Sequence, residues 1–247
     1  MLPILQIGPV SLPLPGLIIL AGIWIGLTVA EKYSEIHHIK PADLTNLIFI
    51  SLLSFLVGGR LGYVIRYWEA FSQDLAGIIS RNLELFDLST GFLCAVLAFI
   101  IYCQRKELPA WQTLDSLTPF FAIISLSIAF SHLASGSAFG SPTTLPWAID
   151  LWGMPRHPTQ VYEILLSIGV LILIWPGKGL LWDSQPGVTF LRFLGLTSIG
   201  VILLEAFRGD SIMMLQGLRR DQVIAWLILA ANLTGLWILY TKRKVSV

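Results

Sequence analysis

Seven apolar runs, each close to the length that crosses a bilayer, constrain this chain more than any other feature. A membrane-spanning helix takes about 20 apolar residues, because lipid offers no partner to an unpaired backbone group. A hydrophobic share of 55% against 13% charged residues excludes a soluble domain. We therefore predict an all-α polytopic membrane protein, with residues 1–247 in one domain. The predicted membrane helices are 16–31, 44–67, 87–104, 114–134, 159–175, 187–207 and 222–241.

The positions of lysine and arginine predict how these helices are oriented. Cytoplasmic loops carry an excess of positive charge, and this favours an N-terminus outside and a C-terminus in the cytoplasm. Every lysine then lies on the cytoplasmic side, whereas the outer loops carry only arginine. The outer arginines are Arg81, Arg156, Arg208, Arg219 and Arg220. Arginine binds phosphate and carboxylate in a bidentate manner, so the outer face is predicted to hold anions.

The stretch 153–163 gathers more polar chemistry than any other part of the chain. Pro158 suits the first turn of a helix, where no backbone hydrogen bond is lost. His157, Gln160 and Glu163 then recur every three residues, so they lie near one face of that helix. A polar face entering a membrane is expected to look inward. The alternative interpretation is an interfacial cap in the headgroup layer, which explains the charges but not a whole polar face.

Other polar residues interrupt the predicted membrane helices. Arg60, between glycines in the second helix, needs a partner or a polar cavity, and Asp115 of the fourth helix is one candidate. His132 lies further along that fourth helix among serines, where a packing role is more common than a catalytic one. The net charge of +1 gives no reason to expect nucleic acid, and no metal-ligand cluster or cofactor motif is present.

At this point the motifs resemble those of the bacterial prolipoprotein diacylglyceryl transferases, which are integral enzymes of seven membrane helices. The similarity extends over nearly the whole length of the chain. Its most specific part is Arg156-His157-Pro158-Thr159-Gln160-Val161-Tyr162-Glu163, preceded by Pro146-Trp147-Ala148. Further matches are Gly8–Val10, Gly58–Tyr63, Asp115 with Pro119, Glu205–Arg208 and Gln222.

The resemblance implies an enzyme of the bacterial plasma membrane that moves the diacylglyceryl group of phosphatidylglycerol onto the thiol of a lipobox cysteine. Its implied partners are phosphatidylglycerol or another anionic phospholipid, and the signal peptides of prolipoproteins. The implied catalytic residues are Arg208 with His157 or His132 as the base. The implied substrate-binding residues are Arg60, Asp115, Gly140, Arg156, Gln160, Tyr162, Glu163 and Glu205.

Several positions depart from the family pattern. Ser89 stands in place of a histidine, and Pro15 in place of a tyrosine. In the fourth helix the family's arginine, two asparagines and glutamate are replaced by Ala129, His132, Ser135 and Ser137. The sequence therefore leaves three hypotheses open: an active transferase with a rearranged centre, a degenerate paralogue that binds phospholipid or a partner protein, and an enzyme acting on another substrate of the same lipid platform.

Overall fold

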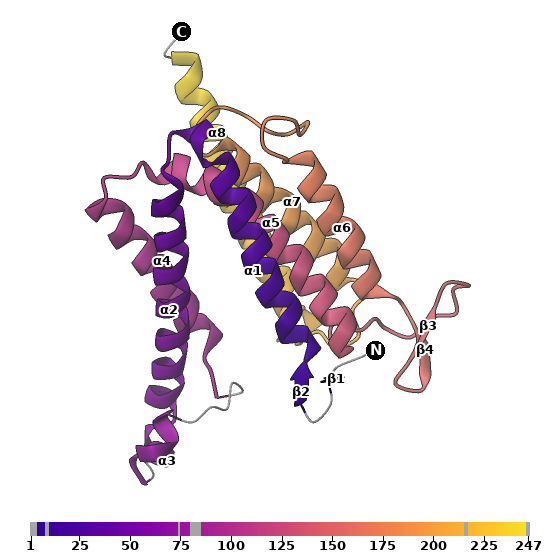
Figure 1. Ribbon diagram of the computed structural model, residues 1–247. Helices are drawn as coiled ribbons and strands as arrows, with labels where there is room; N and C mark the ends of the chain where they lie inside the picture. Colours follow the sequence, from indigo (N-terminus) through magenta and orange to yellow (C-terminus); the bar gives the residue numbers. More distant parts are fainter. Residues whose placement is uncertain (1–3, 8–9, 74, 80–84, 215–216, 246–247) are drawn as a thin grey trace. The chain divides into compact units, whose positions relative to one another are not determined.

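The computed structural model describes residues 4–7, 10–73, 75–79, 85–214 and 217–245, and these residues are mainly helical (Figure 1). The long helices are α1 Leu14–Tyr33, α2 Pro41–Arg66, α4 Leu88–Arg105, α5 Ala110–Ser135, α6 Thr159–Leu173, α7 Val188–Glu205 and α8 Arg220–Val245. The short helical segments are η1 Ser34–His37, α3 Trp68–Gln73 and η2 Leu75–Ile79. Two antiparallel hairpins pair β1 Ile4–Ile7 with β2 Val10–Pro13, and β3 Ile149–Leu151 with β4 Met154–Arg156.

All seven predicted apolar segments are helical, so the prediction of an all-α polytopic membrane protein is confirmed. Six helices in the described part of the chain are long and apolar enough to cross a membrane. The seventh predicted segment, 159–175, forms α6, which has 15 residues and falls short of that length. The predicted orientation stays a prediction. The side chains of Lys242, Arg243 and Lys244, and Arg81 as a whole, lie outside the described residues.

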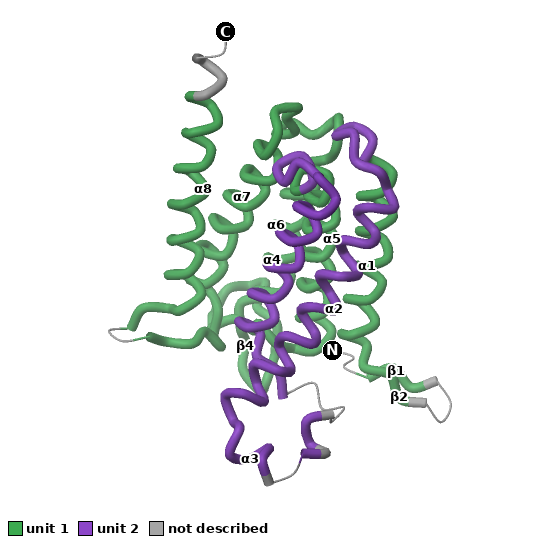
Figure 2. Tube along the Cα trace, turned by 90° about the vertical axis from the view of Figure 1, so that its left-hand side faces the viewer, with its two compact units in different colours: residues 1–33, 114–247 green, residues 34–113 purple. Residues whose placement is uncertain are grey.

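The chain divides into two compact units (Figure 2). Unit 1 comprises Met1–Tyr33 and Leu114–Val247, and unit 2 comprises Ser34–Thr113. Unit 1 therefore holds α1, α6, α7, α8 and nearly all of α5, whereas unit 2 holds α2 and α4. The expectation of one domain over residues 1–247 stays a prediction.

Small residues bring the helices of unit 1 close together. A methyl group added at Gly22 of α1 would collide with Ser127 of α5, and one at Gly200 of α7 would collide with Leu166 of α6. Backbones can approach this closely only where the side chain is small. Between α5, α6 and α7, Ala122, Val170, Ile174 and Phe193 form a buried apolar cluster. These contacts fix the relative positions of the three helices that carry the candidate site.

Unit 1 has two chemically different ends. At one end, called the hairpin end here, α5 and α7 finish, α6 and α8 begin, and the β3–β4 hairpin lies (Figure 1). At the other, called the Asp115 end, the Asp115 carboxylate accepts hydrogen bonds from the backbone N–H groups of Gly187 and Phe190. Asp115 is 2% exposed and caps the start of α7, where amide groups lack partners within the helix.

In unit 2, α2 packs against α4 through a glycine face. A methyl group at Gly58 would collide with Cys94, and one at Gly62 would collide with Thr90. Arg60 points into this unit, where Nε donates to the carbonyl of Ile78 at 2.9 Å. Its Nη1 and Nη2 donate to the carbonyls of Leu85 and Gly77 at 2.7 and 2.6 Å. Backbone carbonyls thus supply the partners that Arg60 needs. Asp115, the candidate partner, accepts hydrogen bonds from the α7 amides with both of its oxygens.

The substitution Arg60→Leu tests the structural role of this arginine. Removing the guanidinium leaves three carbonyl groups without their donor, and each such loss costs about 1–3 kcal/mol where water cannot replace it. We expect a thermal midpoint in detergent lowered by several degrees and a reduced yield. Arg105→Leu is the control, because Arg105 is an exposed arginine at the end of α4. An Arg60→Leu protein as stable as the control would contradict a structural role.

Cysteine labelling tests the predicted orientation. In a variant whose Cys94 and Cys103 are replaced by alanine, a cysteine placed at Lys106 should react with a membrane-impermeant maleimide only after the cells are opened. A cysteine placed at Thr144, in the exposed loop at the hairpin end, should react in intact cells. The reverse pattern would show that the chain is inserted the other way round.

Candidate functional site

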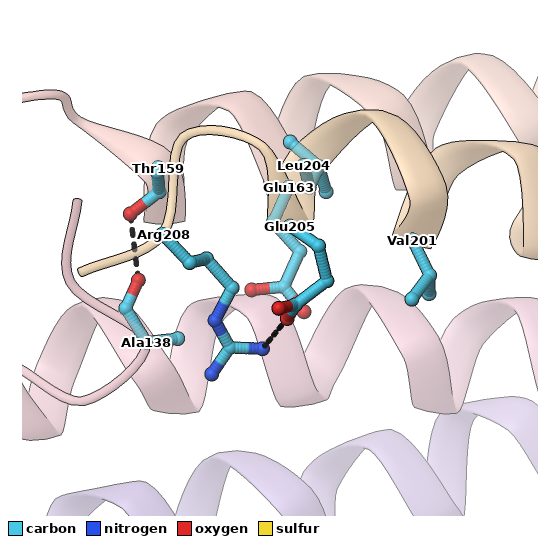
Figure 3. A pocket seen from close by; sticks show the side chains of 7 residues that line it. All are labelled: Ala138, Thr159, Glu163, Val201, Leu204, Glu205 and Arg208. Atoms are coloured by element: carbon cyan, nitrogen blue, oxygen red, sulfur yellow. Dashed lines mark hydrogen bonds and ion pairs between the residues drawn. The ribbon is translucent and has the colours of Figure 1, made fainter. Parts of the chain in front are cut away.

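A small pocket opens at the hairpin end of unit 1, between the end of α7, the start of α6 and the loop that follows α5. Its volume is about 50 Å³, which is room for a few water molecules. The lining residues are Ala138, Thr159, Glu163, Val201, Leu204, Glu205 and Arg208. Figure 3 shows the carboxylates of Glu163 and Glu205 pointing toward the guanidinium of Arg208. Apolar helix walls therefore surround one cation and two acids.

Arg208 lies directly after α7 and is held by acids on two sides. Its Nη1 is 3.1 Å from Oε1 of Glu205, which is 1% exposed, and its Nε donates to Oδ1 of Asp210 at 3.1 Å. Burial alone would lower the pKa of the guanidinium. The hydrogen bond to Asp210 and the charges of Asp210, Glu205 and Glu163 outweigh burial and raise that pKa. Arg208 is therefore a permanent positive charge in the pocket.

His132 and Glu163 form a pair between α5 and α6. Nδ1 of His132 lies 2.8 Å from Oε2 of Glu163. A carboxylate can only accept a hydrogen bond, so Nδ1 of His132 is the donor in this contact, and in the neutral imidazole Nε2 then carries the lone pair. An imidazole oriented in this way can accept a proton at Nε2. Because Glu163 lines the pocket, the pair joins a base to the site of Arg208.

Three chain segments pack closely together at the hairpin end, and no space remains there for a side chain at Gly140 or Gly209. A methyl group added at Gly140 would collide with the carbonyl of His157, and one at Gly209 would collide with the carbonyl of Gly140. The backbone N–H of Gly209 donates to the carbonyl of Phe139 at 2.8 Å, and the backbone N–H of Ser141 donates to the carbonyl of Phe207 at 2.7 Å. The close packing at Gly140 thus fixes the backbone position from which the Arg208 side chain projects.

The start of α6 is joined to the loop that follows α5. The hydroxyl of Thr159 donates to the carbonyl of Ala138 at 2.6 Å, and Nε2 of Gln160 donates to that of Ser137 at 2.9 Å. Gln160 is fully buried, and its Oε1 has no hydrogen-bond partner among the described residues. Gln160 therefore holds the start of α6 against the loop after α5 and does not line the pocket.

Arg156 and the aromatic residues of the hairpin end support the site from outside the pocket. Arg156 donates to the carbonyls of Leu151 and Gly140 at 3.1 and 3.2 Å and stacks over Phe139, with Cζ 4.9 Å from the ring centroid. Tyr162 accepts a hydrogen bond from the indole of Trp147 at 2.8 Å. Its ring forms a cluster with those of His157 and Phe207.

The structure thus brings some predicted site residues together and places others elsewhere. Glu163, Glu205 and Arg208 line the pocket, His132 bonds to Glu163, and Gly140, Arg156, His157, Gln160 and Tyr162 lie at the same end of unit 1. Asp115 lies 17 positions before His132 on α5, about 25 Å away at the rise of a helix. Arg60 belongs to unit 2. Neither of these two residues lines the pocket.

Sequence reasoning missed four residues near the pocket. Asp210 binds Arg208, Thr159 lines the pocket, and Ser211 donates to Oε2 of Glu205 at 2.6 Å. Arg219 donates from Nη1 to the carbonyl of Arg208 at 3.0 Å. The only signal in the sequence was the acid two residues after Arg208. The residue types of Thr159 and Ser211 gave no such signal. Arg219 reaches Arg208 through a chain reversal that is seen in the fold and not in the sequence.

Comparison with known proteins agrees with these motifs. The family model described as prolipoprotein diacylglyceryl transferase matches residues 3–238. A relative named phosphatidylglycerol–prolipoprotein diacylglyceryl transferase from Synechococcus elongatus is 28% identical, over 98% of this chain and 89% of its own. Relatives of the same name from Acaryochloris marina and Finegoldia magna are 27% and 28% identical, over 98% and 94% of this chain and 92% of each relative.

The residues that the family model leaves unmatched are confined to the two termini, so the match includes every helix that carries the candidate site. The predicted resemblance is confirmed. This multi-pass membrane protein belongs to the prolipoprotein diacylglyceryl transferase family.

Proposed function

We propose that this protein transfers the diacylglyceryl group of phosphatidylglycerol to the thiol of a lipobox cysteine in the bacterial plasma membrane. The observation that carries the proposal is the meeting of an oriented histidine–carboxylate pair with a permanently charged arginine at one pocket. The names of the relatives, which specify this donor lipid and a prolipoprotein acceptor, support the same reaction.

The reaction can be written with the residues at the pocket. Nε2 of His132 takes the proton of the cysteine thiol, while Glu163 holds the imidazole through Nδ1 and stabilises its positive charge. The thiolate sulfur forms a bond to the glycerol carbon of the diacylglyceryl group that carries the phosphate. The bond between that carbon and the phosphate oxygen breaks, and its electron pair leaves with glycerol phosphate. The imidazolium then returns its proton to solvent.

Arg208 is placed to stabilise the leaving group. The phosphate carries one negative charge as a diester and gains a second as the bond to carbon breaks. A fixed guanidinium lowers the energy of the developing charge, because it needs no reorganisation during the reaction. Glu205 and Asp210 hold Nη1 and Nε, so Nη2 is the nitrogen left for a phosphate oxygen among the described contacts.

A second candidate function is binding of a phospholipid without turnover. One observation favours it: the charge of Arg208 is already matched by Glu205 and Asp210, so a phosphate must compete with two carboxylates. Ala129, Ser135 and Ser137, which replace charged or amide residues of the family pattern, add no further donor of the arginine type. The two functions can be told apart by glycerol phosphate, which is released by the transferase reaction and not by binding alone.

The substitution His132→Gln tests the proposed base, and glutamine is chosen because asparagine is the residue of the family pattern at this position. Purified protein is mixed with phosphatidylglycerol vesicles and a lipobox peptide, and the released glycerol phosphate and the thioether-linked peptide are measured. Because general-base catalysis contributes about 10²–10⁴-fold, we expect the rate to fall by that factor. His38→Asn is the control, since His38 is an exposed histidine with a φ of 58° that asparagine tolerates.

Two outcomes would contradict this assignment. A wild-type protein that retains phosphatidylglycerol but releases no glycerol phosphate, and that does not restore lipoprotein lipidation in a strain depleted of its own transferase, favours the second function. A His132→Gln protein as fast as the His38→Asn control removes His132 from the reaction while leaving the transferase activity itself in place.

The substitution Arg208→Ala tests the phosphate contact by a measurement that needs no turnover. A charge-assisted hydrogen bond contributes about 1.5–3 kcal/mol, so its loss should weaken binding by about tenfold or more. In native mass spectrometry we expect the variant to lose phosphatidylglycerol and to keep diacylglycerol, which has no phosphate, at the wild-type level. Equal retention of both lipids by both proteins would remove Arg208 from lipid binding.

A further inference from the structure

The segment that joins α7 to α8 returns to the pocket after leaving it. Met213 and Arg219 form an antiparallel bridge, and the backbone N–H of Arg220 donates to the carbonyl of Ile212 at 2.9 Å. This reversal brings Arg219 back beside Arg208, 11 positions earlier in the chain. Neither Ser211 nor Arg219 lines the pocket, yet both bond to residues at its wall.

Arg219 holds two parts of the turn at once. Its Nη1 donates to the backbone carbonyl of Arg208 at 3.0 Å and to the hydroxyl of Ser211 at 3.1 Å. A guanidinium can donate only, so both contacts have a fixed direction. The side chain of Arg219 therefore fixes the backbone from which Arg208 projects and also orients the Ser211 hydroxyl.

The oriented Ser211 hydroxyl forms a hydrogen bond with the buried Glu205 carboxylate. It accepts from Arg219, so its own proton is available to Oε2 of Glu205, to which it donates at 2.6 Å. Glu205 meets Arg208 with its other oxygen, Oε1. The two hydrogen bonds in the series run in the direction that the donors and acceptors allow, from Arg219 to Ser211 and from Ser211 to Glu205, and the contact between Arg208 and Glu205 is an ion pair.

We infer that Ser211 and Arg219 are positioning residues that hold Arg208 ready for the phosphate of the lipid substrate. This inference rests on the proposed function, in which Arg208 contacts that phosphate. The Ser211 hydroxyl supplies part of the hydrogen bonding that the buried Glu205 carboxylate needs. Without it, Glu205 depends on Arg208 alone and competes more strongly with a phosphate for the guanidinium.

Arg220 provides a matched control within the same turn. It is the neighbour of Arg219 and carries the same charge, but its Nε pairs with Asp221 at 2.9 Å, and both partners are more than one-third exposed. A general effect of positive charge on anionic lipid should be the same for Arg219→Ala and Arg220→Ala. An effect of the directed bonds should appear for Arg219→Ala only.

The test uses the full-length protein and five variants: Ser211→Ala, Ser211→Thr, Arg219→Ala, Arg219→Lys and Arg220→Ala. Retention of phosphatidylglycerol against diacylglycerol, which has no phosphate, is measured by native mass spectrometry. We expect Ser211→Ala and Arg219→Ala to lower the ratio by roughly five- to tenfold, which corresponds to one lost hydrogen bond. Ser211→Thr, which keeps the hydroxyl, and Arg220→Ala should stay within about twofold of the wild type. Arg219→Lys should lie between these two groups, because lysine cannot donate in a fork.

Hydrogen exchange provides a readout that requires neither lipid nor turnover. We expect the backbone amides of residues 206–211 to exchange faster in Ser211→Ala and Arg219→Ala than in Arg220→Ala, with equal exchange in α5 for all proteins. In transfer assays, the two alanine variants at 211 and 219 should lower kcat more than they raise KM, because the chemistry depends on the orientation of Arg208.

The outcomes separate this inference from the proposed function. If the wild type prefers phosphatidylglycerol but Ser211→Ala and Arg219→Ala keep the same preference and exchange rates, the positioning role is wrong and the phosphate role of Arg208 stands. Equal losses in Arg219→Ala and Arg220→Ala also overturn it. If the wild type shows no preference, the phosphate role of Arg208 fails, and with it the inference that its positioning serves a phosphate.

Discussion

The ion pair between Glu205 and Arg208 determines how the hairpin end of unit 1 is built. A carboxylate that is 1% exposed at the end of a membrane helix is costly unless its charge is matched and its lone pairs are used. Arg208 supplies the charge and Ser211 a hydrogen bond. Arg208 lies three residues after Glu205, and Gly140 and Gly209 let the segment that carries it cross the loop after α5 without side chains between the two backbones. The pocket is the space that this arrangement leaves beside Glu163.

The same arrangement supports the proposal that one site both binds the lipid phosphate and carries the reaction. The acids that surround Arg208 raise its pKa and fix two of its nitrogens, so the guanidinium is charged and oriented before any ligand arrives. Glu163, which also lines the pocket, fixes the imidazole of His132. In the proposed reaction the phosphate binds Arg208, in the turn after α7, and the thiol meets His132 of α5. Preorganisation of this kind is the main way in which a protein lowers a barrier that involves charge separation.

Much of the fold could be predicted from sequence. Each membrane helix forms all of its backbone hydrogen bonds within itself, so it can be recognised from the length and composition of its apolar segment. All seven apolar segments are helices, although α6 is shorter than predicted. The site was predicted less completely. The polar face of α6 placed Glu163 at the pocket, but His157 on that face packs against Phe207 instead of lining it. Arg156 has the residue type expected of a phosphate ligand, yet it bonds to the carbonyl of Leu151 in its own hairpin and to that of Gly140 in the loop after α5. Residue type does not reveal which acceptor lies nearest, and the partnership of Ser211 and Arg219 with Arg208 requires a chain reversal that has no periodic signal.

Photo-crosslinking with a phosphatidylglycerol analogue, carrying a diazirine on its headgroup glycerol, tests most directly whether the hairpin end of unit 1 holds the lipid phosphate. After irradiation in vesicles, the modified peptides are mapped by mass spectrometry. The account predicts labels within residues 132–141, 159–164 and 203–211, and their loss in Arg208→Ala protein. Labels confined to the Asp115 end, at residues 110–116 and 187–192, would contradict it.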